Sequence, residues 1–152
     1  MIYAADHWHR TYIYLEAGKT YQFIAQGEWV DGQEKFSPAG REIGGFHIRD
    51  VIHLTSSAIG EAETIFNKMT GDHADFWWTR RHEDVPWFAL MGHIASAFGE
   101  DDQNLATGET FKIGDRATFT PKLGGYLYCY ANDAWQAYGN NRGSVQLTVS
   151  SL

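Results

Sequence analysis

The chain has 152 residues, enough for one domain with a single core and short for two ordinary domains. Apolar residues make up 43% and charged residues 20%, which is the composition of a globular protein and excludes a disordered chain. The formal charge of −7 and the lack of a Lys/Arg cluster argue against a nucleic-acid partner, because binding to phosphates depends on cationic side chains.

The first forty residues alternate between apolar and polar positions, as half-buried strands do. Residues 11–15 and 20–27 are expected to form a hairpin, whose second strand 28–30 can continue. Asp31-Gly32 and the segment 37–40 carry turn residues and are expected to begin a loop.

An irregular stretch from about Arg41 to Pro86 follows, and we interpret it as an insertion. Apolar residues at helical spacing between Ser57 and Met69 predict one short amphipathic helix within it. Phe76-Trp77-Trp78 then supplies a large apolar surface, for which packing of the insertion is favoured over ligand contact.

Short apolar segments separated by turn residues return after the insertion. Several strands at this spacing, with one helical interruption, indicate an all-β sandwich or jelly roll formed by a single domain over residues 1–152, with the insertion at about 41–86. The expected strands are 87–91, 109–113, 116–120, 125–131 and 144–149.

The single cysteine, Cys129, stands among aromatic residues and is expected to be a buried core thiol rather than a nucleophile. The first residues have neither a basic region nor an apolar stretch typical of a signal peptide, and no segment approaches the length of a membrane span. We therefore expect a soluble protein without membrane insertion. Residence in the cytoplasm and export by a route independent of a signal peptide both stay open.

The segment 132–144 lies between two predicted strands and is rich in oxygen-bearing side chains. Calcium takes six to eight hard oxygen ligands from carboxylates, amides and carbonyls, and Asp133, Asn140 and Asn141 offer such oxygens. On spacing alone, a plain turn built from Asn140, Asn141 and Gly143 is an equally good reading, because Asn and Gly favour turns.

Particular residues of this loop resemble a known family. Asn132-Asp133, Tyr138–Asn141 and Gly143-Ser144 are similar to the signature loop of the PA-IL family of bacterial galactose-binding lectins. The segments 89–94, 111–115 and 125–128, and further upstream 36–40, follow the strand order of that family. The resemblance covers nearly all of the chain outside about 41–86.

The resemblance implies a small jelly-roll, galactose-binding-like β-sandwich that binds sugar and is not an enzyme. It implies one Ca²⁺ held by the protein and by two adjacent hydroxyls of a galactose-type hexose. The implied metal ligands are the carboxylate of Asp133, the side-chain oxygens of Asn140 and Asn141, and the main-chain carbonyls of Asp31 and Ala137. Lectins of this kind are often multivalent, so a homo-oligomer is an expectation.

The second group of sugar contacts departs from the family pattern, which has a His and a Gln separated by Pro-Asp. The nearest candidate in this chain is Arg81-His82-Glu83-Asp84. The long insertion can therefore reshape the pocket and change the preferred sugar. The residues that we expect to bind sugar are His82, Asp84, Asp133, Ala134 and Asn140.

Three other functions compete with a lectin. A transition-metal or catalytic site could use His7 and His9, which would share one face of a strand, with His82 or the segment 72–75, although no zinc motif supplies further ligands. A hydrolase could use a carboxylate pair. The candidate carboxylates are Glu83, Asp84, Glu100 and Asp101.

The remaining alternative is a non-catalytic protein-interaction or scaffold module that has kept a lectin-like fold and has lost or changed its sugar ligand. Fold alone does not establish function, and the aromatic insertion could then bind protein. The intact Asp133, Asn140 and Asn141 favour the lectin.

Overall fold

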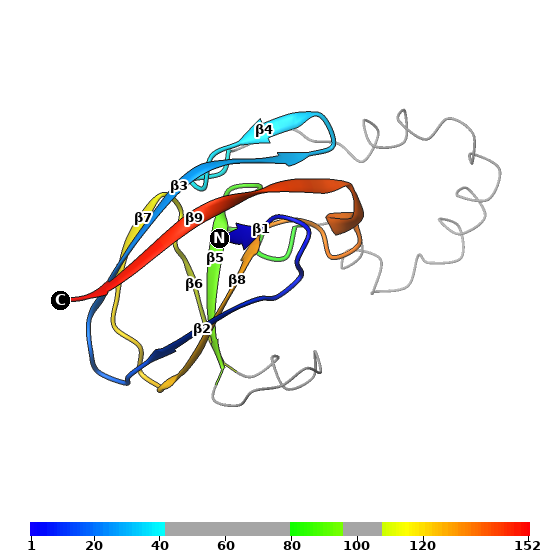
Figure 1. Ribbon diagram of the computed structural model, residues 1–152. Helices are drawn as coiled ribbons and strands as arrows, with labels where there is room; N and C mark the ends of the chain where they lie inside the picture. The colour runs from blue at the N-terminus through cyan, green and yellow to red at the C-terminus, as the bar shows by residue number, and fades with distance from the viewer. Residues whose placement is uncertain (42–79, 96–107) are drawn as a thin grey trace, which may run out of the picture.

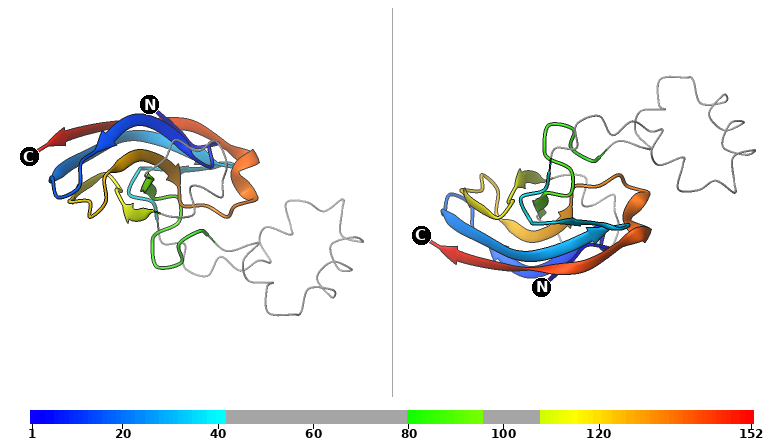
Figure 2. Two further views of the ribbon diagram at one scale, coloured as in Figure 1. Left: turned by 90° about the horizontal axis from the view of Figure 1, so that it is seen from below. Right: turned by 90° about the horizontal axis from the view of Figure 1, so that it is seen from above.

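The computed structural model describes residues 1–41, 80–95 and 108–152, which form two antiparallel sheets packed face to face (Figure 1). The two layers are seen edge-on in Figure 2. One sheet has the order β1-β9-β3-β4, with β7 also paired to β3, and the other has the order β2-β8-β5-β6. The all-β sandwich expected from the sequence is confirmed. The strands are β1 (Ile2–Tyr3), β2 (His9–Leu15), β3 (Tyr21–Asp31), β4 (Glu34–Phe36), β5 (Leu90–Ala95), β6 (Glu109–Lys112), β7 (Arg116–Phe119), β8 (Gly125–Ala131) and β9 (Asn141–Ser151).

The longest pair in the structure joins β3 and β9, with eleven residues in each strand. Their register runs from Tyr21 opposite Ser151 to Asp31 opposite Asn141. The ladder therefore holds Asp31, at the end of β3, beside Asn141, at the start of β9. The pair β3–β4 closes over this end through a tight Gly32-Gln33 turn, with Asp31 opposite Glu34.

The expected hairpin between residues 11–15 and 20–27 is wrong. Both segments are strands, but β2 pairs with β8 in one sheet and β3 pairs with β4, β7 and β9 in the other. The connection between them therefore crosses from one layer to the other. Alternation of apolar residues identifies a strand and its buried face. The pattern does not reveal which other strand is its partner in the sheet.

Other boundaries also differ from the expectations. β5 begins at Leu90 instead of Trp87, because the positive φ of 61° at Phe88 interrupts the extended backbone. The short strands β1 and β4 were not predicted. The predicted helix at 57–69 lies outside the described residues, as do Phe76-Trp77-Trp78.

The core lies between the two sheets. Trp29 is fully buried and its indole Nε1 donates a hydrogen bond of 3.2 Å to the carbonyl of Phe88. Cys129 lies in this core, where burial raises the pKa of its thiol far above the usual range, so the expected role as a core thiol is confirmed. Other members of the core are Leu15, Phe23, Phe36, Leu90, Ile94, Leu127 and Val145.

The two ends of the irregular stretch meet on the sandwich. The amide of Arg41 donates a hydrogen bond of 2.9 Å to the carbonyl of Trp87, and the two residues form an isolated bridge. Gly40, at φ 71°, makes this approach possible, because a Cβ atom there would lie 2.6 Å from the carbonyl oxygen of Trp87. The residues at the two ends of the stretch 41–86 are therefore hydrogen-bonded neighbours.

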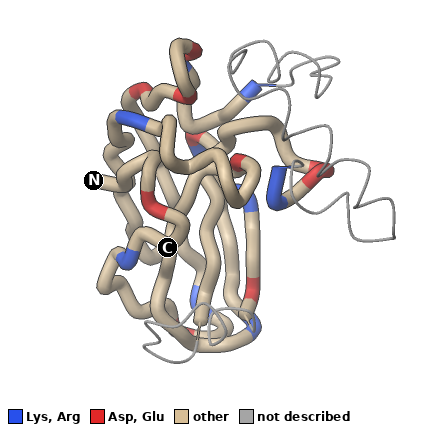
Figure 3. The backbone as a smooth tube through the Cα atoms, turned by 90° about the vertical axis from the view of Figure 1, so that its right-hand side faces the viewer, with Lys and Arg blue, Asp and Glu red and all other residues tan. Residues whose placement is uncertain are grey.

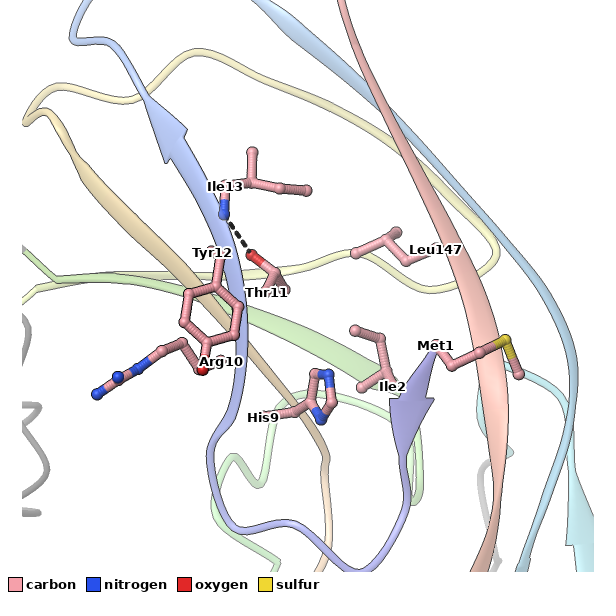
Figure 4. Close-up of a pocket in the computed structure, with 8 residues that line it drawn as sticks. All are labelled: Met1, Ile2, His9, Arg10, Thr11, Tyr12, Ile13 and Leu147. Carbon is pink, nitrogen blue, oxygen red and sulfur yellow. Dashed lines mark hydrogen bonds between the residues drawn. The ribbon is translucent and has the colours of Figure 1, made fainter.

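A hollow of about 290 Å³ opens between the sheets beside β1 and β2 (Figure 4). Ile2, Ile13 and Leu147 come from three strands and face one another across it. Tyr12, which is 73% exposed, stands on its rim. The hollow shares no lining residue with the loop that carries the candidate site.

No helix among the described residues is long and apolar enough to cross a membrane. The Lys and Arg residues of the described backbone are dispersed, with acidic residues between them (Figure 3). Along the described backbone the Lys and Arg positions therefore form no continuous basic stripe.

Candidate functional site

The candidate site lies where the chain passes from one sheet to the other. β8 ends at Ala131, the loop turns through a short 3-10 helix, η3 (Ala137–Asn140), and β9 begins at Asn141. η3 stands at the end of the sandwich opposite the C-terminus (Figure 1). This crossing brings Asp133, just after β8, to the end of the β3–β9 ladder.

Four oxygen-bearing side chains gather at this crossing. The amide Nδ2 of Asn141 donates to Oδ2 of Asp133 at 2.9 Å, and Nδ2 of Asn140 donates to Oδ1 of Asp31 at 2.8 Å. Asp133 and Asn141 are buried, at 0% and 4% exposure, while Asp31 is half-buried and Asn140 is exposed. The cluster therefore has a buried floor and a rim that solvent reaches.

The Asp133 carboxylate is electrostatically unfavourable as it stands. Burial, and then the charge of Asp31, raise the pKa of Asp133 to about 7, although hydrogen bonds from Asn141 and from the Ala134 amide oppose the shift. The Ala134 amide donates to Oδ1 at 2.7 Å. A cation near the two carboxylates would favour their charged forms and so offset this shift.

These residues fit a calcium ion. Two carboxylates balance the charge of Ca²⁺, and carboxylate and amide oxygens are its preferred ligands. The Oδ1 atom of Asn141 is buried and has no hydrogen-bond partner among the described residues, although a buried amide oxygen is costly to leave unsatisfied. It is therefore available as a ligand next to Asp133.

Two further expected residues of the loop lie beside this cluster. Ala137 begins η3, and its amide donates to the carbonyl of Ala134 at 2.9 Å. Ala134 is buried and forms an isolated bridge with Arg80. The structure thus brings Asp31, Asp133, Asn140 and Asn141 together and places Ala134 and Ala137 in the turn between them.

Asn132 ties a distant segment to the site. Its Nδ2 donates to the carbonyls of His82, Val85 and Pro86, at 2.9, 3.0 and 3.2 Å, and its Oδ1 accepts from the amide of His82 at 3.0 Å. The amide of Arg81 donates to the carbonyl of Asp133 at 3.1 Å. The segment 80–86 is therefore held against the loop, as its expected role in sugar contact requires.

The two side chains predicted to bind sugar in this segment differ in their surroundings. The His82 imidazole is half-buried and lies 2.7 Å from the hydroxyl of Tyr130 through Nε2. Its pKa is lowered by burial and by the charge of Arg81, with Asp84 opposing, so the ring is neutral at pH 7. Asp84 is exposed. Neither residue contacts the oxygen cluster through a hydrogen bond given by the structure.

Arg81 was not predicted as a site residue, yet it organises the surface next to the loop. Its guanidinium lies 3.6 Å from the ring centroid of Tyr130, 4.1 Å from that of Trp8 and 4.7 Å from that of Trp135. It also donates to the carbonyl of His7 at 2.7 Å. The residues come from four separate parts of the chain, so sequence spacing could not have found this cluster.

The histidine-based alternative is not assembled as expected. His7 precedes β2 and bonds the carbonyl of Trp135 through Nε2 at 2.7 Å, whereas His9 begins β2 and bonds Asp6 through Nδ1 at 2.7 Å. The expectation that the two share a strand face is therefore wrong. No group of three or more His, Cys, Asp or Glu residues gathers within residues 1–41, 80–95 and 108–152. Asp72–Asp75, Glu100 and Asp101 lie outside the described residues.

Comparisons with known proteins bear on the fold. No protein-family model matches the chain, and no curated protein matches it by sequence. Among solved structures, a chain described as "EclA N-terminal domain; PllA-like lectin" is similar, with a TM-score of 0.57 and 15% sequence identity. The alignment covers 99% of this chain and 92% of that chain. The described residues therefore form a β-sandwich similar in fold to that lectin domain.

Proposed function

We propose that this protein is a calcium-dependent lectin that binds galactose-type hexoses and catalyses no reaction. One observation carries the proposal: the buried Asp133 carboxylate lies near the charge of Asp31 and accepts from Nδ2 of Asn141, whose buried Oδ1 has no partner among the described residues, at the loop that crosses between the sheets. The description of the similar structure as a lectin supports sugar binding over a scaffold role. The loop motif that resembles the PA-IL family supports calcium and galactose.

Each residue has a part in this proposal. Asp133 and Asn141 form the floor, Asp31 and Asn140 form the rim, and the carbonyls of Asp31 and Ala137 complete the set of oxygens. When bound, the metal supplies a point of attachment for two adjacent sugar hydroxyls. Asn140 is the exposed member of the set, so its amide can also hydrogen-bond the sugar.

Calorimetric titration with calcium tests the proposal and its pH dependence. We expect one calcium per chain, bound more tightly in the presence of galactose. The pKa of Asp133 is raised to about 7, so below that pH the protonated carboxyl must lose its proton before it can bind metal. Affinity should fall by up to about tenfold for each pH unit below 7 and level off above about 8, because one proton is released per calcium.

Titrations in two buffers of different ionisation enthalpy measure the proton release directly. Zinc binding in place of calcium would support the transition-metal alternative, and binding of neither metal would support the scaffold module. Calcium affinity that is independent of pH between 5.5 and 8 would contradict the predicted release of a proton from Asp133 on calcium binding.

A second prediction concerns His82 and Asp84. We propose that they contact the outer hydroxyls of the sugar, since Asn132 holds their segment against the loop. His82→Ala and Asp84→Ala should leave calcium affinity unchanged and should weaken or shift the glycan-array profile at saturating calcium. The exposed Glu83, between them, gives the matched control Glu83→Ala. Array profiles identical to wild type, with equal signal, would mean that neither residue touches sugar.

A further inference from the structure

The middle of the loop between β8 and β9, residues 135–139, depends on side chains for its position. Among the described residues, the backbone–backbone hydrogen bonds of this stretch all stay within residues 134–141. The proposed metal ligands Asp133, Asn140 and Asn141 lie on either side of it. The relative positions of these ligands therefore depend on what holds the side chains between them.

Two side chains of this stretch pack against the sandwich, and Arg81 contacts both of them. The Arg81 guanidinium lies 4.7 Å from the ring centroid of Trp135, and its Nη1 donates a hydrogen bond of 3.2 Å to the hydroxyl of Tyr138. That hydroxyl donates in turn to the carbonyl of Ala131, at the end of β8. The amide of Arg81 donates to the carbonyl of Asp133 at 3.1 Å. One residue therefore holds the loop through both its backbone and its side chain.

The same guanidinium is anchored to parts of the chain outside the loop. It lies 3.6 Å from the ring centroid of Tyr130, on β8, and 4.1 Å from that of Trp8. Its Nη1 also donates to the carbonyl of His7 at 2.7 Å. The ring of His7 stacks on that of Tyr138 at 4.3 Å, and its Nε2 bonds the carbonyl of Trp135 at 2.7 Å. A planar cation that packs on rings and donates several hydrogen bonds can join separate segments in this way.

We propose that Arg81 is the positioning residue of this loop: it fixes residues 135–139, so that Asp133, Asn140 and Asn141 are in place before calcium binds. The inference rests on the proposed function and adds a residue outside the ligand set. Positioning raises calcium affinity, because a loop that is not fixed must lose conformational entropy when it binds the ion. Charge alone predicts the opposite effect, because a guanidinium near the site repels calcium. The sign of the change in calcium affinity therefore separates positioning from electrostatics.

Arg81→Met tests the proposal in three measurements. In the calcium-free protein, amide hydrogen exchange should be about tenfold faster in residues 135–139 than in wild type, and unchanged in β3 and β9. Calorimetry should show calcium affinity lower by about tenfold, since the ring contacts and hydrogen bonds that hold the loop are lost. At saturating calcium, galactose affinity should equal that of wild type, because the bound ion then keeps the loop in place.

Two further variants complete the test. Arg81→Lys keeps the charge but has no planar group to pack on the rings, so its effects on exchange and on calcium affinity should be intermediate. If Arg81→Met does not fold, Arg81→Lys carries the same comparison. Arg80→Met is the matched control, because it removes the same charge one residue earlier, where Nε of Arg80 donates to the carbonyl of Glu83 at 3.1 Å. It should leave exchange of residues 135–139 unchanged and should not lower calcium affinity.

Unchanged or higher calcium affinity in the Arg81 variants would overturn the proposal, as would exchange of residues 135–139 at the wild-type rate. A wild-type protein that binds no calcium would instead overturn the proposed function. The exchange comparison needs no calcium, so it decides separately whether Arg81 holds the loop.

Discussion

Replacing Asp133 with asparagine is expected to lower calcium affinity by about a hundredfold or more while the sandwich stays folded. The change removes one of two negative charges from the cluster and keeps the size of the side chain. Calcium sites depend strongly on the number of charged ligands, because each carboxylate offsets the loss of water from the ion. Asn140 and Asn141, which are neutral, cannot replace that charge.

The fold should tolerate this change. Burial and the charge of Asp31 make the ionised Asp133 unfavourable, so the free energy of unfolding of the calcium-free protein should not fall near pH 8. The new amide keeps one oxygen, which can accept the 2.7 Å hydrogen bond from the Ala134 amide. Asp133→Ala is a harsher variant, because it also removes the acceptor of the Ala134 amide. In both variants Nδ2 of Asn141 loses Oδ2 of Asp133 and keeps the carbonyl of Ala4 at 3.3 Å.

Calorimetry measures the calcium affinity, and thermal unfolding with and without calcium measures the fold. Asp115→Asn makes the same charge change at an exposed residue that lies outside the loop, and it should bind calcium like wild type. An Asp133→Asn protein that folds and retains wild-type calcium affinity would show that the metal site lies elsewhere.

The second large effect is the loss of sugar binding when calcium is removed. We expect the protein to be retained on a galactose matrix in calcium and to elute completely when a calcium chelator is added. Two sugar hydroxyls complete the metal shell in the proposed mechanism, so sugar affinity and calcium affinity are linked and each must raise the other by the same factor. Adding calcium in excess of the chelator should restore retention.

Magnesium provides the control for this experiment. Mg²⁺ prefers near-octahedral geometry at shorter distances and releases its waters reluctantly, so it should not restore retention in the presence of a calcium-selective chelator. Elution by free galactose in calcium shows that retention is specific to sugar. Retention that persists in the chelator would contradict the calcium bridge even if the protein binds calcium.

The sequence was sufficient to locate most of the strands and the loop between β8 and β9. Alternation of apolar and polar residues located β2 and β3, and turn residues on either side of a short apolar segment located β8. Asp133, Asn140 and Asn141 stood out because hard oxygen ligands and turn residues fall together between two strands. These properties depend only on residues that are close together in the sequence, so the sequence reveals them.

The partners of the strands were decided only by tertiary structure. Residues 11–15 and 20–27 have the pattern of a hairpin, yet the two strands belong to different sheets. A strand that pairs with the next strand in the sequence and a strand that lies in the other sheet have the same alternation of apolar residues. The choice depends on which long-range ladder is available, and here β9 offers β3 an eleven-residue partner.

The site also depends on contacts that spacing does not encode. The sequence singled out Asp31 for its carbonyl, but the β3–β9 register places its carboxylate beside Asn140 and close enough to Asp133 to shift the pKa of that residue. Asn132 holds the segment 80–86 against the loop. The Arg81 guanidinium contacts the rings of Trp8 and Trp135, which lie far from it in the sequence. The sequence by itself therefore determined which residues carry oxygens and which strands form. Only the tertiary structure decided which of those oxygens meet, because their distances follow from the pairing of strands far apart in the chain.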